Sequence, residues 1–170
     1  MDKYVAWVSN YLKLYKAIFH KYSAMNISRS ITRKAITFDD MNSQKSVLGT
    51  PEVYNFLSAF KITSCFPHIK REDIKRVIKL INLQGNEINQ STLSLIGFIE
   101  FVLNIGRLAY PEIDKASIFM PLLFSHMKDV SLSSKQPLFQ RLFEDPQAST
   151  IGDPKLISAL TLQVNRNPNF

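Results

Sequence analysis

Apolar residues recur at helical spacing through most of this chain. Between residues 66 and 110 they form two stripes that are separated by a polar loop, with steps of three or four positions inside each stripe. The first stripe consists of Ile74, Val77, Ile78 and Ile81, and the second of Phe98, Phe101, Val102, Ile105, Leu108 and Ala109. The pattern predicts a helix over 70–82, a loop over roughly 83–95 and a second helix. Such a unit cannot bury both stripes alone, so the rest of the chain should pack on it.

Three further helices are expected. A heptad-like apolar seam covers 2–24. Thr50-Pro51-Glu52 forms a helix start, with a hydroxyl N-cap, proline at the first helical position and an acid in the first turn. An apolar helix is predicted over 114–128, and Pro121 inside it predicts a kink or a later start. Five glycines are too few for a turn-rich β-sandwich or barrel, so the fold class is predicted to be all-α.

A length of 170 residues fits one domain with an arm. We expect a helical domain over 1–110, an accessory helix over 111–128 that packs on it, and an extended arm over 129–170. Asp153-Pro154 predicts a short helix near 154–165 in that arm. The few apolar side chains of the arm, which are expected to contact a partner, include Leu138, Leu142 and Phe143.

The net charge of +7 is concentrated at one end of the chain. Residues 1–34 contain seven basic residues and one acidic residue, a net charge of +6. A second basic cluster surrounds the helix predicted over 70–82, opposite its apolar stripe, and Glu72 is placed for an ion pair with Arg76. Such faces suit either solvent or an acidic partner, which is a protein, a nucleic acid or a lipid. The candidate partner-binding residues are Lys13, Lys16, Lys21, Arg29, Arg33, Lys34, Lys70, Arg71 and Lys75.

The residues that carry catalytic or metal chemistry are sparse. Cys65 is the single cysteine, so no internal disulfide forms, and a Cys65–His68 pair lacks the further ligands that zinc needs. The three histidines are far apart in sequence, and Gly85 is isolated rather than part of a phosphate-binding loop. No apolar run has signal-peptide or membrane-spanning character. We expect no enzyme activity, no cofactor, no metal and no membrane partner, and a reducing cytosolic compartment.

The segments 36–41 and 93–98 both resemble the end of an EF-hand loop. The corresponding residues are Ile36 and Leu93 at loop position eight, Asp40 and Gly97 at position twelve, and Met41 and Phe98 directly after it. The spacing resembles a calmodulin-like EF-hand pair that covers roughly residues 4–109. This resemblance implies that Ile36 and Leu93 pair in a short β-bridge. The segment 42–49 departs from the family pattern as an insertion.

The calcium ligands of that family are missing from both loops. Calcium needs about six or seven oxygen ligands, mostly carboxylates, and a glycine at loop position six. At positions one, three, five and six the first loop has Arg29, Ile31, Arg33 and Lys34, and the second has Asn86, Ile88, Gln90 and Ser91. We therefore predict that neither loop binds calcium.

A longer run resembles degenerate EF-hand-like modules of protist ciliary and flagellar proteins. It extends from Phe60-Lys61-Ile62 through Pro67-His68-Ile69 and Gly97-Phe98-Ile99-Glu100-Phe101 to Ala109-Tyr110. The resemblance implies a non-catalytic structural component of a ciliary or flagellar axoneme, within the cytoplasmic cytoskeleton. Its partners would be microtubules and neighbouring axonemal proteins of a large assembly. Two alternatives are a calmodulin-like adaptor or light-chain-type subunit that binds a helix of a larger protein, and a subunit of an RNA–protein assembly.

Overall fold

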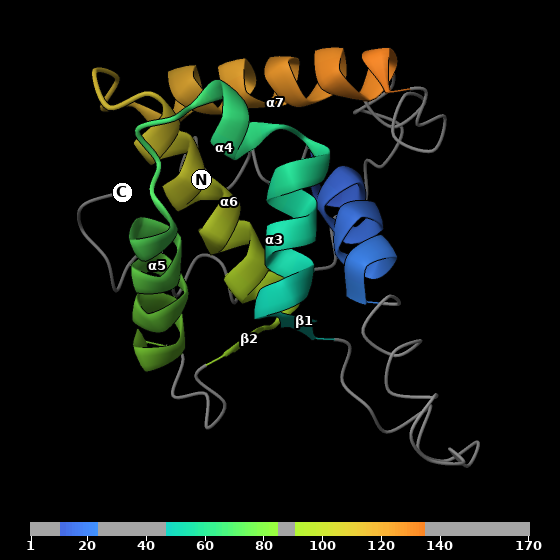
Figure 1. Cartoon of the computed structure of the whole chain (residues 1–170), viewed down its shortest axis with the longest axis vertical. Helices are drawn as coiled ribbons and strands as arrows, with labels where there is room; N and C mark the ends of the chain where they lie inside the picture. Colours follow the sequence, from blue (N-terminus) through green and yellow to red (C-terminus); the bar gives the residue numbers. More distant parts are fainter. Residues whose placement is uncertain (1–10, 24–46, 85–90, 135–170) are drawn as a thin grey trace. The chain divides into compact units, whose positions relative to one another are not determined.

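The computed structural model describes residues 11–23, 47–84 and 91–134. Apart from two short strands, its elements are helices, which confirms the all-α class (Figure 1). An N-terminal helix is described over 11–23. It is followed by β1 (Leu48–Gly49), α3 (Thr50–Ala59), α4 (Ile62–Cys65), α5 (Arg71–Gln84), β2 (Thr92–Leu93), α6 (Leu95–Ala109) and α7 (Ala116–Ser133). The helix predicted near 154–165 lies outside the described residues.

The chain divides into two compact units. One unit is Ala17–Phe101, and the other combines Met1–Lys16 with Val102–Phe170. The N-terminal helix and α6 therefore each contribute residues to both units. The core of each unit is described separately below.

In the unit Ala17–Phe101, two strands join the segments that precede α3 and α6 (Figure 1). They are antiparallel, with Leu48 opposite Leu93, and both leucines are 0% exposed. Thr50 adds to the bridge, because its backbone N–H and its hydroxyl each donate to the Ser91 carbonyl at 3.1 Å. Leu93 thus pairs with Leu48, and Ile36, its expected partner, lies outside the described residues. Each strand lies just before a helix. Leu48 holds the same place before α3 that Leu93 holds before α6.

The start of α3 differs from the predicted one in its cap. Gly49, not Thr50, is the N-cap residue, because the Thr50 hydroxyl is engaged with Ser91. Pro51 lies in the first turn, where its missing N–H is harmless. Glu52, at the third helical position, is 2% exposed, and its carboxylate lies over Gly49. A carboxylate at this position serves as the acid of a capping box, and a Cβ on residue 49 would approach Glu52 Oε2 to 2.6 Å.

Aromatic side chains fill the core of the unit Ala17–Phe101. The rings of Phe56 and Phe98 meet edge to face, with centroids 5.3 Å apart. Tyr22 packs edge to face on Phe56 at 5.9 Å, and Phe19 packs on Phe98 at 6.0 Å. These four side chains are buried, and edge-to-face pairs add to the stabilisation that burial supplies. Rings from the N-terminal helix, α3 and α6 thus meet in one aromatic cluster.

α6 begins at a serine cap and a close helix contact. The Gly97 N–H donates to Ser94 Oγ at 3.2 Å, which satisfies one of the free donors at the helix start. A Cβ on residue 97 would lie 3.2 Å from Ile81 Cγ2 and 3.5 Å from Leu93 Cδ2. The absence of a side chain at Gly97 therefore lets Ile81 of α5 lie close to α6.

In the second unit, α7 is longer than predicted. It runs from Ala116 to Ser133 and includes 129–133, which the sequence had placed in the extended arm. Pro121 lies inside the helix, so the predicted start near it is wrong. Only the backbone bond from residue 121 to the Ser117 carbonyl is lost. Both residues are exposed, so this gap in the hydrogen bonding lies on the solvent side of α7.

The core of the second unit contains rings from the N-terminal helix and from α7. Tyr11 stacks on Phe124 with centroids 5.0 Å apart, and Tyr15 meets the same ring edge to face at 5.5 Å. α6 contributes Gly106, where an added Cβ would lie 2.8 Å from Met120 Sδ and 3.0 Å from Phe119 Cδ2. Gly106 thus sets the close approach of α6 and α7.

The Gly106→Val variant should be less stable than the parent protein. Its side chain would overlap Met120 and Phe119, and overpacking of this kind lowers the free energy of unfolding by about 1–3 kcal/mol. Urea unfolding measures the loss. Ser125→Val, on an exposed position of α7, is the control and should change stability by about 0.5 kcal/mol or less. Equal stabilities of the two variants would contradict the close contact.

The Lys61→Gly variant should be more stable than the parent protein. Lys61 follows the C-cap of α3 with a φ of 52°, in the left-handed region, and this turn places the flanking Phe60 and Ile62 in the core. Glycine adopts this conformation without strain, so the variant should gain about 0.5–1 kcal/mol in the free energy of unfolding. Lys61→Ala keeps the strain and removes the same side-chain charge. An equal gain from the alanine variant would assign the effect to charge instead.

Candidate partner-binding surface

The second basic cluster of the sequence lies on α5 and the residue that precedes it. One side of α5 is buried through Ile74, Ile78 and Ile81. Five exposed cations precede or lie along this helix, namely Lys70, Arg71, Lys75, Arg76 and Lys79. We call these five residues the α5 basic face. By helical spacing Lys75, Arg76 and Lys79 lie opposite the buried isoleucines, as the sequence predicted, whereas Arg71 is seven positions before Ile78 and lies on the isoleucine side.

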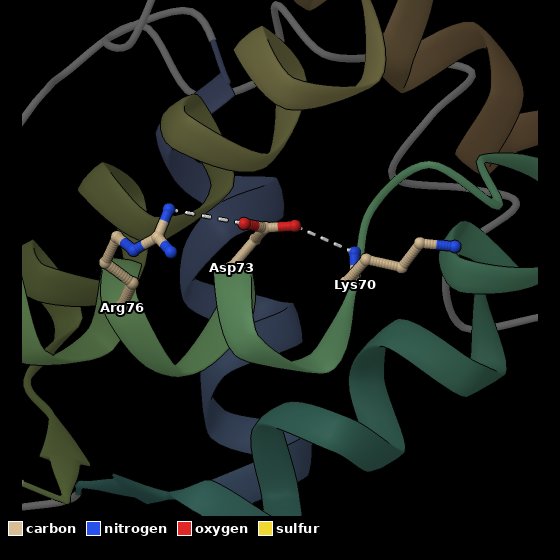
Figure 2. Close-up of polar contacts among 3 residues, drawn as sticks. All are labelled: Lys70, Asp73 and Arg76. Carbon is tan, nitrogen blue, oxygen red and sulfur yellow. Dashed lines mark hydrogen bonds and ion pairs between the residues drawn. The ribbon is translucent and has the colours of Figure 1, made fainter.

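The first turn of α5 is organised around Asp73 (Figure 2). Its Oδ2 accepts the backbone N–H of Lys70 at 3.0 Å, and its Oδ1 lies 3.5 Å from Arg76 Nη1. The expected ion pair of Arg76 with Glu72 is replaced by this one. The bond to Lys70 holds the Asp73 carboxylate in place, and its second oxygen then lies within reach of Arg76. The Arg76 side chain is 70% exposed, so this pair contributes little to stability.

Lys70 and Arg71 are also held by neighbouring groups. Lys70 Nζ donates to the Pro67 carbonyl at 3.0 Å. The Arg71 guanidinium lies 5.0 Å from the ring centroid of Tyr54 in α3, and the Tyr54 hydroxyl donates to the Arg71 carbonyl at 3.4 Å. A cation over an aromatic ring gains roughly 0.5–1 kcal/mol at an exposed site. The first half of the α5 basic face is therefore positioned by contacts within the protein.

Lys75 and Lys79 of α5 are different. Within the described residues, Lys75 and Lys79 make no ion pair or side-chain hydrogen bond, and they lie one helical turn apart. Leu80 and Leu83 are 51% and 55% exposed. These two leucines are not among the contact residues predicted from the sequence. The sequence does contain a sign of their exposure, because both are apolar residues that fall outside the spacing of the buried isoleucine stripe.

The other predicted contact residues are more scattered. Lys13 is exposed on the N-terminal helix, and Lys16 is partly buried. Lys21 Nζ lies 5.8 Å from the ring centroid of Tyr22, and burial lowers the pKa of Lys21. The remaining predicted residues, which lie outside the described residues, are Arg29, Arg33, Lys34, Leu138, Leu142 and Phe143.

The described part of the chain offers no group of three or more His, Cys, Asp or Glu side chains able to hold a metal ion. Cys65 and His68 are both exposed, and the His68 ring packs edge to face on Phe66 with centroids 6.2 Å apart. Among the helices described, none combines the length and the apolar character required to cross a membrane.

Buried ionisable groups lie in the core rather than beside the α5 basic face. Glu100 of α6 is 6% exposed, and loss of solvation raises the pKa of its carboxyl to about 7. Burial also raises the pKa of Tyr22 to about 12. Both shifts arise from desolvation, which disfavours the charged form of an acid. The Glu100 carboxyl is therefore a core group that changes its charge near neutral pH.

Protein-family models, curated proteins and solved structures were compared with the chain, and no match was found in any of the three comparisons.

The Glu100→Gln variant should change how stability depends on pH. The folded-state pKa is raised from 4.5 to about 7. The free energy of unfolding of the parent protein therefore falls as pH rises from about 4.5 to about 7, because the unfolded state loses this proton first. Above pH 7 the variant avoids a buried charge and should be more stable by about 2–3 kcal/mol. Denaturant unfolding at pH 5, 6, 7 and 8 measures the difference.

Glu72→Gln, which removes an exposed acid from α5, is the matched control and should leave the pH profile of the parent protein unchanged. Parallel profiles of the parent and Glu100→Gln proteins would show that Glu100 ionises normally in the folded state.

Proposed function

We propose that the protein is a non-catalytic structural component of a ciliary or flagellar axoneme that binds the acidic surface of microtubules. The observation that supports this most strongly is the α5 basic face, on which five exposed cations lie along one helix. Tubulin presents an acidic surface and acidic tails, so the charges are complementary. Such complementarity speeds association and selects partners. Lys13 on the N-terminal helix adds a further exposed cation.

The scaffold that we propose for this role is an EF-hand-like pair. The N-terminal helix precedes β1 and α3, and α5 precedes β2 and α6, so each strand lies between two helices. Leu48 and Leu93 bridge the two strands. Counted from these leucines, buried apolar residues recur at the same steps in both halves. The matched pairs are Val53 and Phe98, Phe56 and Phe101, Leu57 and Val102, and Phe60 and Ile105.

The same count supports a calcium-inert scaffold. With Leu48 at loop position eight, Glu52 falls at position twelve, and Met41, Ser43 and Lys45 fall at positions one, three and five. Methionine and lysine are not calcium ligands. Gly97 is at position twelve of the other loop, where a side chain would meet Ile81. Partner binding by this protein should therefore not depend on calcium.

An adaptor that binds one helix of a larger protein is the second candidate. It is favoured by apolar side chains exposed along α7, since Ile118, Leu122 and Leu132 are 50%, 42% and 44% exposed. Apolar anchors at helical spacing suit contact with a partner helix. An adaptor would follow one target protein, whereas an axonemal component would bind along a lattice.

The purified full-length chain should co-sediment with stabilised microtubules at low salt. Binding should weaken as ionic strength rises, because salt screens exposed charges over about 8 Å at 0.15 M, and added calcium should not change it. The Lys13→Glu variant should bind more weakly; Lys16 and Lys21 are left unchanged because both are partly buried. Absence of pelleting at low salt would favour the adaptor, and calcium-dependent pelleting would contradict the inert scaffold.

A further inference from the structure

The free binding capacity of α5 lies in two of its lysines. Lys70, Arg71 and Arg76 contact Pro67, Tyr54 and Asp73. Lys75 and Lys79 have no ion pair or side-chain hydrogen bond with any described residue. From Ile74 to Leu83 the sequence contains three cations and no acid. An acidic partner would therefore meet no like charge on this part of the helix.

Two exposed leucines accompany these free cations. Leu80 and Leu83 are separated by three positions, so they lie on one side of α5, and each is more than half exposed. A purely polyacidic segment would satisfy Lys75 and Lys79 but leave both leucines in contact with water. A surface with apolar side chains among its acids would cover all four residues. The combination thus favours a mixed acidic and apolar contact.

A lipid surface fits the same residues less well. Helices that lie in a membrane interface insert a whole apolar face. The continuous apolar face of α5 is Ile74, Ile78 and Ile81, and it is already buried in the protein. Two leucines remain, which is a small area for insertion but sufficient for a contact with another protein.

We propose that Lys75, Lys79, Leu80 and Leu83, here called the α5 docking face, bind the folded acidic surface of the partner rather than a disordered polyacidic tail. This inference rests on the proposed function, because it takes the microtubule as that partner. The lysines contact carboxylates, and the leucines contact apolar side chains between them. Binding then has one component that salt weakens and another that salt leaves in place.

The test is co-sedimentation of the full chain with intact microtubules and with microtubules whose C-terminal tails have been removed by protease. The charge variant is Lys75→Glu/Lys79→Glu, and the apolar variant is Leu80→Gln/Leu83→Gln. Glutamine retains helix propensity and adds no charge. Controls on α7 and its N-cap are Lys115→Glu/Lys128→Glu and Leu122→Gln/Leu132→Gln, and thermal unfolding verifies that every variant is folded.

Both α5 variants should raise the Kd for microtubules by about tenfold or more, since anchor contacts of this kind dominate affinity. The effect of the charge variant should shrink at about 0.3 M salt, whereas the effect of the apolar variant should persist. Microtubules without tails should bind the parent chain nearly as well as intact ones.

The inference is overturned if the folded α5 variants bind like the parent chain, if the α7 controls weaken binding equally, or if removal of the tails abolishes binding. In each of these cases the parent chain still binds intact microtubules, so the proposed function stands while the docking face fails. If the parent chain does not pellet at all, the proposed function fails and this inference fails with it.

Discussion

The pairing of Leu48 with Leu93 is the constraint on which the unit Ala17–Phe101 depends. Both leucines are fully buried, and the Thr50–Ser91 bonds extend the pairing by one step. Since each strand runs directly into a helix, the bridge places the starts of α3 and α6 next to each other (Figure 1). Phe56 and Phe98 can then meet edge to face, and the other core rings pack around them. Two residues per strand thus align helices that are far apart in sequence.

Different residues lie at the starts of α3 and α6, at the same number of positions after the paired leucines. Four positions after Leu48 is Glu52, a buried acid whose carboxylate lies over Gly49. Four positions after Leu93 is Gly97, where the missing side chain admits Ile81. One half uses a side chain to complete its helix start, and the other uses the absence of one to bring two helices together. Neither residue is arranged as a member of a ligand cluster, since the described residues contain none.

The spacing of apolar residues in the sequence predicts where most helices form, but it does not predict which residues contact each other between the elements. The stripes of α5 and α6 are visible as three- and four-residue steps, and the buried isoleucines of α5 follow from them. Leu48 pairs with Leu93 because it lies just before the start of α3. Counting loop positions along the sequence does not show where that helix starts relative to the strand. Arg76 pairs with Asp73 because a backbone N–H already orients that carboxylate, a detail of side-chain geometry. Leu80 and Leu83 lie outside the apolar stripe of α5, so the helical periodicity that predicts its buried residues does not point to them.

The cations at the start of α5 have a structural explanation that Lys75 and Lys79 do not need. A helix start carries partial positive charge, so a cation there is unfavourable, whereas one near the helix end is favourable. Lys70 and Arg71 lie at the unfavourable end, and the Pro67 carbonyl, the Tyr54 ring and the capping role of Asp73 offset this. Lys75 and Lys79 need no such support and have none among the described residues. Their charges, together with the exposed leucines beside them, are the groups that we propose contact the partner.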